Sequence, residues 1–424
     1  MAGDAVTTGS YNVAMGYEAL STEDAHGRNV AIGHRALKDL DAGADGYNVA
    51  VGYDAGTNLT TGANNVILGA VAGDALTTGT DNIAIGIGAL GAEDAHGLNI
   101  AIGTNALTAL DVGAQGHNVA IGYNAGTAMT TGLNNTLIGS YAGDALTTGG
   151  QNVAVGNGAF GSANGSEGKN VAIGYDALNA MDADGDAYNV AVGHSAGKAV
   201  STGVENVLIG GLAGDALTTG HYNVAIGMRA LSSEDAHGYN VAIGRDALKV
   251  QNAGANAYNV AIGYQAGLAV TTGVQNTIIG GLAGDALTTG HYNVAIGYEA
   301  LSTEDGHGTN VAVGYRALKT LNAGADGYST AIGYNAGAAI TTGINNTLIG
   351  GNTGLALLSG NDNVAVGTYA ADALTVGVRN VAIGTYALSS EDGHGYNVAI
   401  GHGALLNQNA GDDAHNTAVG YNAG

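Results

Sequence analysis

Apolar and polar residues alternate in a short word, Asn-Val-Ala-Ile-Gly or a close variant, that returns along the whole chain. Val and Ile fall on one face of such a segment and Asn, Ala and Gly on the other, the period-2 pattern of a β-strand. The word occurs 24 times, and only Ser329 replaces its leading Asn. We therefore expect about 24 short strands. The Val/Ile face should fill the interior, and the Ala/Gly face should be flat enough for another strand or another chain to approach closely.

The spacing of the words defines coils. Counted from Asp4, coils of 17, 17, 19 and 17 residues form a block of 70 or 71 residues, and the blocks cover 4–73, 74–143, 144–214, 215–284, 285–354 and 355–424. A helix-pair repeat needs roughly 33 to 47 residues, so this shorter period favours one turn of a β-solenoid. The predicted fold class is all-β: one parallel β-solenoid (β-roll) array over 1–424, with about 24 coils of 17–19 residues.

The composition fits a thin interior repeated many times. There are 75 Gly and no Pro, Cys or Trp, with one Phe against 21 Tyr. The absence of Pro leaves backbone N–H donors available for a continuous ladder, and collagen is excluded because it requires Pro and regular glycines. We expect positive φ at the Gly after Ile and at the Gly that closes each Thr-Thr-Gly or His-Gly loop.

The charge excludes several classes of partner. The formal net charge is −24, from 35 acidic and 11 basic residues, and no basic stripe is present. Such a chain repels phosphate backbones, so we expect no nucleic-acid partner. No segment holds 18 uninterrupted apolar residues and no secretion signal is recognisable at the start of the sequence, so we expect no membrane insertion. Without Cys, the sequence says nothing about the redox compartment.

The leading Asn residues should form one column when the coils stack at about 4.8 Å. Amide side chains in such a column donate and accept hydrogen bonds from coil to coil, so we interpret these residues as architectural. The first eight members of the predicted ladder are Asn12, Asn29, Asn48, Asn65, Asn82, Asn99, Asn118 and Asn135.

The words also resemble known repeats. Asn223-Val224-Ala225-Ile226-Gly227 is similar to the head repeats of trimeric autotransporter adhesins, and the word 131–139 is similar to repeats of phage and bacterial tail fibres. The resemblance implies a left-handed β-roll with three chains around one axis, in an adhesive or spacer role.

We therefore expect a non-enzymatic, homotrimeric fibre segment of an extracellular appendage or virion, most similar to a phage tail-fibre protein. A self-stacking cell-surface filament, joined head to tail, and a carbohydrate-binding adhesin are the alternatives. The expected partners are other copies of the chain, a host surface glycan or another fibre protein. No recurring Ser/His/Asp set supports catalysis, and we expect no cofactor.

Two sets of residues are weak candidates for binding. The second-coil loops bring carboxylates and imidazoles close together, as a divalent metal would require, although a solvated loop whose side chains cap backbone groups is the favoured interpretation. These loops contain Glu23, Asp24, His26, Glu93, Asp94, His96, Glu234, Asp235 and His237, and the pattern returns in blocks five and six. Aromatic rows can also stack on sugars, which makes Tyr53, Tyr123, Tyr264 and Tyr334 candidate glycan contacts.

Overall fold

The structure, a computed structural model, describes residues 1–23, 25–163 and 165–424. It contains two compact units, Met1–Thr219 and Gly220–Gly424. Within the described residues there are 24 strands of three residues each and no helix, and therefore no helix that could cross a membrane. Whether the whole chain forms one array stays a prediction.

The first unit contains twelve strands, one in each coil. They are β1 (Val13–Met15), β2 (Val30–Ile32), β3 (Val49–Val51), β4 (Val66–Leu68), β5 (Ile83–Ile85), β6 (Ile100–Ile102), β7 (Val119–Ile121), β8 (Thr136–Ile138), β9 (Val153–Val155), β10 (Val171–Ile173), β11 (Val190–Val192) and β12 (Val207–Ile209).

The second unit repeats this arrangement. Its strands are β13 (Val224–Ile226), β14 (Val241–Ile243), β15 (Val260–Ile262), β16 (Thr277–Ile279), β17 (Val294–Ile296), β18 (Val311–Val313), β19 (Thr330–Ile332), β20 (Thr347–Ile349), β21 (Val364–Val366), β22 (Val381–Ile383), β23 (Val398–Ile400) and β24 (Thr417–Val419).

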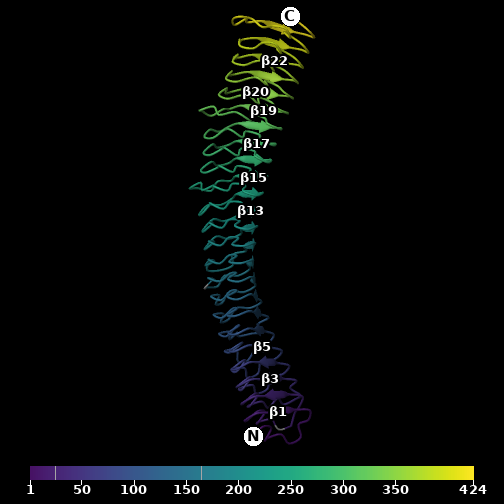
Figure 1. The fold of residues 1–424 in the computed structure, drawn as a ribbon, viewed down its shortest axis with the longest axis vertical. Coiled ribbons are helices and arrows are strands. Elements are labelled where there is room, and N and C mark those ends of the chain that lie inside the picture. Colours follow the sequence, from purple (N-terminus) through teal and green to yellow (C-terminus); the bar gives the residue numbers. More distant parts are fainter. Residues whose placement is uncertain (24, 164) are drawn as a thin grey trace. The chain divides into compact units, whose positions relative to one another are not determined.

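Strands pair with their neighbours in chain order, parallel and in register, within each unit. Val241 of β14 lies opposite Val260 of β15, and Ala242 opposite Ala261. In Figure 1 the labelled strands β13 to β22 follow this order, one coil after another. The all-β, parallel β-solenoid predicted from the word spacing is confirmed, with one strand per 17–19 residues.

The prediction that Val and Ile fill the interior is wrong. In most strands the central residue is fully buried, as Ala31 and Ala242 show, whereas the flanking Val and Ile remain partly exposed. The interior wall opposite the strand carries Leu side chains such as Leu37 and Leu248, both fully buried. Where these Leu side chains occupy the narrow coil, the small Ala and the polar Asn of the strand face inward. Other strands carry a large buried residue at the centre instead, as β8 does with Leu137.

The glycine prediction holds at one position and fails at the other. Gly33, directly after Ile32, has φ of 138°, and a Cβ there would collide with the Gly52 carbonyl oxygen of the next coil. Gly27, which closes a His-Gly loop, has no positive φ, but a Cβ would collide with the Ser10 carbonyl oxygen. Close approach between coils therefore selects glycine in the loops, without a left-handed backbone.

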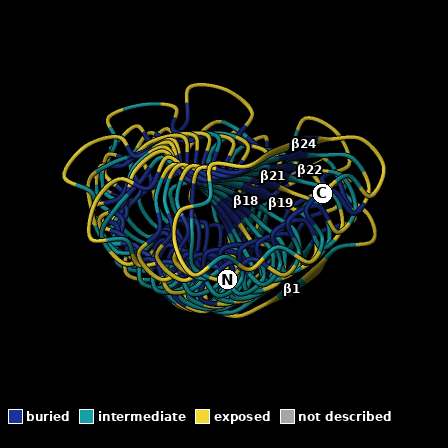
Figure 2. Ribbon diagram, turned by 90° about the horizontal axis from the view of Figure 1, so that it is seen from above, coloured by how far each residue is buried: buried dark blue, intermediate teal, exposed yellow. Residues whose placement is uncertain are grey.

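Exposed loops project from the coils and are drawn as yellow arcs in Figure 2. One of them spans residues 41–46 in the 19-residue coil that contains β3, where most residues are exposed. Such loops carry much of the charge, whereas the strand surface carries none at the outward positions.

Candidate functional site

The outward side of the strands is a continuous uncharged surface within each unit, which we call the Val/Ile face. It consists of the first and third residues of every strand, which are Val, Ile, Thr, Leu or Met. In-register pairing places like residues above one another, so that Ile243 lies opposite Ile262. Several of these side chains keep more than a third of their surface in water, for example Ile332 at 39%. Contiguous apolar surface exposed in this way is typical of interaction sites in general.

Two aromatic columns border the Val/Ile face. One column precedes the buried Asn, where Tyr222, Tyr239 and Tyr258 follow one another with ring centroids 5.0 and 4.9 Å apart. The other column follows the Gly after each strand. We call it the post-Gly column.

In the post-Gly column Tyr298, Tyr315 and Tyr334 stack at 5.7 and 5.2 Å. Stacking covers the ring faces within a run, so only the two end rings of a run offer a face to a ligand.

The four candidate glycan tyrosines all belong to the post-Gly column and are about half exposed, between 47% and 56%. Tyr53 stacks on His34 at 5.0 Å, Tyr334 stacks on Tyr315, and Tyr123 meets Tyr141 edge-on at 5.4 Å. In the following coil the same column holds a small residue every time, namely Ala70, Ser140, Gly281 or Gly351. Each candidate ring therefore lies beside a position that holds no large side chain.

Ion pairs run beside the post-Gly column. Arg35 binds Asp54 through Nε at 2.8 Å and also through Nη2, and His34 Nδ1 lies 3.4 Å from the same carboxylate. The Arg35 hydrogen bond holds the pKa of the Asp54 carboxyl below its ordinary value despite burial. In the second unit Glu299 is paired with Arg316 and Lys319, which likewise lowers its pKa, Lys319 most strongly. These pairs fix the side chains next to the aromatic rings.

The second-coil loops bring the predicted carboxylates and imidazoles together. Asp24 lies outside the described residues, and Glu23 and His26 gather with Asp41 instead. The Glu/Asp/His sets that begin at Glu93 and Glu234 have ligand atoms within 4.8 Å of one another, and so do those that begin at Glu304 and Glu391. The glutamates are fully buried, whereas the histidines are only partly buried.

The buried glutamates accept hydrogen bonds from two neighbouring coils. Glu93 accepts from the backbone N–H of His96 at 2.9 Å and from that of Val112 in the next coil at 3.3 Å. His96 Nδ1 lies 3.5 Å from the same carboxylate. Burial raises the pKa of Glu93, and these backbone bonds partly offset that rise. Both oxygens of Glu93 are thus engaged by protein donors, which favours a structural anchor for the loop over a ligand site.

The third block has an equivalent that the sequence pattern did not reveal. Its loop Gly165-Ser166-Glu167-Gly168 lacks the histidine, yet Glu167 is fully buried and accepts from the Gly165 backbone N–H at 3.0 Å. Among the residues that the structure describes, its other oxygen, Oε1, has no hydrogen-bond partner, and burial raises the pKa of the Glu167 carboxyl. Glu167 lies three residues before the leading Asn170, whereas Glu93 lies six residues before Asn99, so the spacing in the sequence did not reveal the equivalence.

Asn12 is the first of the eight predicted members of the Asn ladder, and the seven members after it are buried. Hydrogen bonds connect all eight from one coil to the next without a break. Asn65 is typical: its backbone N–H donates to Asn48 Oδ1 at 2.9 Å, and its Nδ2 donates to the Gly79 carbonyl oxygen at 2.9 Å. Its own Oδ1 accepts from the Asn82 backbone N–H at 3.0 Å. The side chains therefore satisfy backbone groups at the corner between loop and strand in successive coils.

The comparisons with known proteins found no match. No protein-family model, no curated protein and no solved structure matches this chain. The resemblance to adhesin heads and tail fibres thus remains a prediction from the repeated words.

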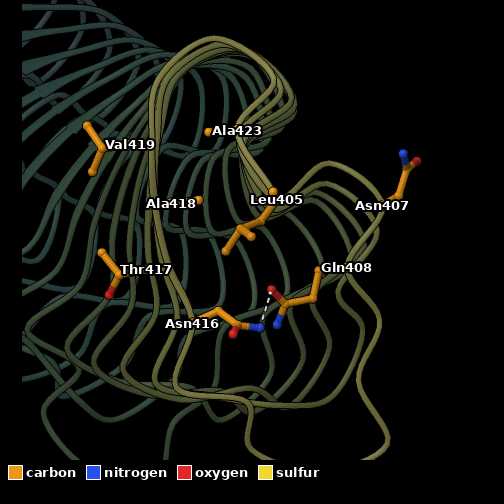
Figure 3. A pocket seen from close by; sticks show the side chains of 9 residues that line it. Leu405, Asn407, Gln408, Asn416, Thr417, Ala418, Val419 and Ala423 are labelled. Atoms are coloured by element: carbon orange, nitrogen blue, oxygen red, sulfur yellow. Dashed lines mark hydrogen bonds between the residues drawn. The ribbon is translucent and has the colours of Figure 1, made fainter.

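A hollow of about 640 Å³ lies at the last coil, between Leu405, Gln408 and Ala418 (Figure 3). Asn416 Nδ2 donates to Gln408 Oε1 across one side of it at 3.0 Å. Leu405 and Ala418 are the counterparts of Leu388 and Ala399, which are fully buried one coil earlier. The hollow is therefore the interior of the last coil, viewed end-on. Leu405 and Ala418, which line it, are the residue types that fill the interior of the preceding coil, so they do not indicate a ligand site.

Proposed function

We propose that the protein is a non-enzymatic structural fibre: the shaft or adhesive segment of an extracellular appendage, most similar to a phage tail-fibre protein of the virion. The Val/Ile face is the observation that carries this proposal. No strand places a charge at an outward position, although the chain has a net charge of −24. Negative charge in the loops keeps the protein soluble, and the uncharged face remains free for association.

Other copies of the chain are the partners that this face fits best. A second copy repeats the same side chains at the same spacing along its own coils, so parallel copies match over many coils at once. Closed association of identical surfaces gives a small cyclic oligomer, and the resemblance to adhesin heads favours three left-handed chains around one axis.

The proposal is tested by placing lysines on the Val/Ile face. A triple variant with Val260→Lys, Val311→Lys and Val364→Lys puts desolvated charges into the association surface and should reduce the solution mass from three chains to one. The matched control changes three exposed apolar residues of the loops in the same unit, Val250, Leu358 and Val376, to Lys and should remain trimeric. A wild-type protein with the mass of one chain overturns the proposal.

Two alternatives are separated by related measurements. A self-stacking filament would show a mass that grows with protein concentration, whereas a closed trimer would not. A carbohydrate-binding adhesin is supported by the half-exposed tyrosines of the post-Gly column, each next to a small residue. Sugar binding by the isolated protein distinguishes this role from a pure spacer.

A further inference from the structure

Tyr264, Gly281 and Tyr298 occupy the same place in three successive coils of the post-Gly column. The Leu282 backbone N–H donates to the Tyr264 carbonyl at 2.9 Å, and that of Glu299 donates to the Gly281 carbonyl at 3.1 Å, which fixes the order of the coils. Both tyrosines are well exposed, Tyr264 at 51% and Tyr298 at 45%. Two aromatic residues thus flank, in this column, a coil that has no side chain there.

The space above Gly281 is bounded only by the ring of Tyr298. A Cβ at Gly281 would lie 3.6 Å from Tyr298 Cδ2, and apart from the two adjacent residues of the chain no other described residue comes within 4 Å of it. Rings two coils apart are separated by about 9.6 Å, so roughly 6 Å remains after the thickness of the two rings is subtracted. One six-membered ring fits between them.

Tyr298 is held in place from its other side. Its ring stacks on Tyr315 at 5.7 Å with an interplanar angle of 16°. A hydrogen bond to Glu299 raises the pKa of the Tyr298 hydroxyl, and Glu299 is itself anchored by Arg316 at 2.8 Å and Lys319 at 2.6 Å. The ring of Tyr298, which forms one wall of this space, is therefore preorganised, and this lowers the entropic cost of binding a ligand.

Gly281 also has a backbone N–H that no described backbone carbonyl accepts. Within the part of the chain that the structure describes, the Gly281 N–H has no acceptor, whereas its carbonyl is used by Glu299. A ligand ring between the tyrosines would need apolar faces for the two walls and an acceptor at its edge for this N–H.

We propose that Tyr264, Gly281 and Tyr298 form a binding notch for a neutral, β-linked hexopyranose of gluco configuration. In this configuration the hydroxyls are equatorial and lie at the ring edge, so both ring faces present only C–H groups. An axial hydroxyl, as in a manno sugar, would press a polar oxygen against one aromatic wall without a partner. The net charge of −24 disfavours acidic sugars.

This inference rests on the carbohydrate-binding alternative and goes further by naming the sugar class and the residues. It does not depend on trimer formation. Solution mass reports on the Val/Ile face and sugar titration reports on the notch, so a failure of either proposal can be recognised separately.

The experiment is calorimetric titration of the full chain with a β-1,4-linked glucose tetrasaccharide and, in parallel, the β-1,4-linked mannose tetrasaccharide. We expect the glucose oligomer to bind about tenfold more tightly, since one desolvated hydroxyl is worth about 1.4 kcal/mol or more. Equal affinity for the two sugars, or no binding of the glucose oligomer, overturns the proposal.

The substitution Gly281→Tyr closes the notch and keeps both walls. Gly281 has no positive φ, so a side chain is tolerated there, and the new ring would continue the stack seen at Tyr298 and Tyr315. We expect about a tenfold loss of glucose-oligomer affinity. The matched control Thr104→Tyr adds a ring to the same column in the other unit, at a position outside the proposed binding residues, and should leave affinity unchanged. Unchanged affinity in Gly281→Tyr contradicts the assignment, and circular dichroism verifies that both variants fold.

Discussion

Leu137, at the centre of β8, fills the space that Gly126 leaves open in the preceding coil. Leu137 Cδ1 lies 2.8 Å from the position that a Cβ on Gly126 would take, and Leu137 is fully buried. Other coils use the opposite solution, with Ala in the strand and Leu in the opposite wall, as at Ala101 and Leu107. Large and small residues thereby complement one another inside neighbouring coils.

Exchanging the two residues should be tolerated better than either change alone. Gly126→Leu overfills the coil and Leu137→Ala leaves a cavity, so each should lower the free energy of unfolding by about 2–4 kcal/mol. The backbone accepts the change, because Leu107 has φ of 49° at the equivalent position where Gly126 has 60°. We expect the free energy of unfolding of the double variant to fall by less than the sum of the two single losses, with a difference of at least about 1 kcal/mol.

Denaturant unfolding of the full chain measures this coupling. The matched control pairs Leu137→Ala with Gly56→Leu, a glycine of the same kind that contacts Ile67 instead. That pair lies several coils apart and should be additive within about 0.5 kcal/mol. Additive behaviour of Gly126→Leu with Leu137→Ala would contradict the packing argument.

Ser329→Asn should stabilise the protein. Ser329 donates to the Gly327 carbonyl at 3.2 Å and accepts from the Asn346 backbone N–H at 3.3 Å. It is too short to reach across the loop as Asn48 does, whose Nδ2 donates to the Gly62 carbonyl at 2.9 Å. Restoring that hydrogen bond should add about 1 kcal/mol to the free energy of unfolding.

The reverse change, Asn48→Ser, is the control for this prediction and should cost a similar amount or more, since Asn48 also binds the next coil. Thermal melts of both single variants are sufficient. A lower melting temperature for Ser329→Asn would show that this corner has no room for the amide.

The protein should be more resistant to unfolding at about pH 4.5 than at pH 7. Burial raises the pKa of several carboxyls above the ordinary 3.8 of Asp and 4.5 of Glu, so between those values and the raised ones the folded chain binds more protons than the unfolded chain. The free energy of unfolding therefore falls as pH rises through this interval. The carboxyls concerned are Asp74, Glu93, Asp144, Glu167, Asp215, Asp285 and Glu304.

The pKa values of Asp54 and Glu299 are lowered, so these two groups make the free energy of unfolding rise with pH, but they are fewer than the carboxyls with raised pKa values. Urea midpoints at several pH values check the sign. Asp144→Asn should flatten the pH dependence, whereas Asn in place of the exposed Asp81 should flatten it much less. A midpoint that rises steadily from pH 4.5 to 7 in the wild type is the contrary result.

Metal chelation should leave stability unchanged, because Glu93 is engaged by protein donors. Glu93→Ala should lower the free energy of unfolding by about 2 kcal/mol, because it leaves the His96 and Val112 N–H groups without acceptors. The control Glu205→Ala removes an exposed carboxylate and should change it by less than about 0.5 kcal/mol. A chelator that lowers the melting temperature of the wild type would favour the metal interpretation.

Much of the fold could be predicted because the repeat is so regular. The 17–19-residue spacing and the two-residue alternation predict one short strand per coil, and Asn residues such as Asn65 recur at a fixed place in the word. The notch at Gly281 and the role of Glu167 could not be predicted, since each depends on which residues adjacent coils bring into one column.

By itself, the sequence determined the period, the strands, the corners after Ile and the identity of the ladder residues, because these are local and repeated many times. Only the tertiary structure decided which face of each strand points inward. Alternation defines two faces, and it says nothing of their direction. The Leu side chains of the opposite wall, such as Leu37, already occupy the narrow coil, so Ala31 faces inward and Val30 and Ile32 are left at the surface.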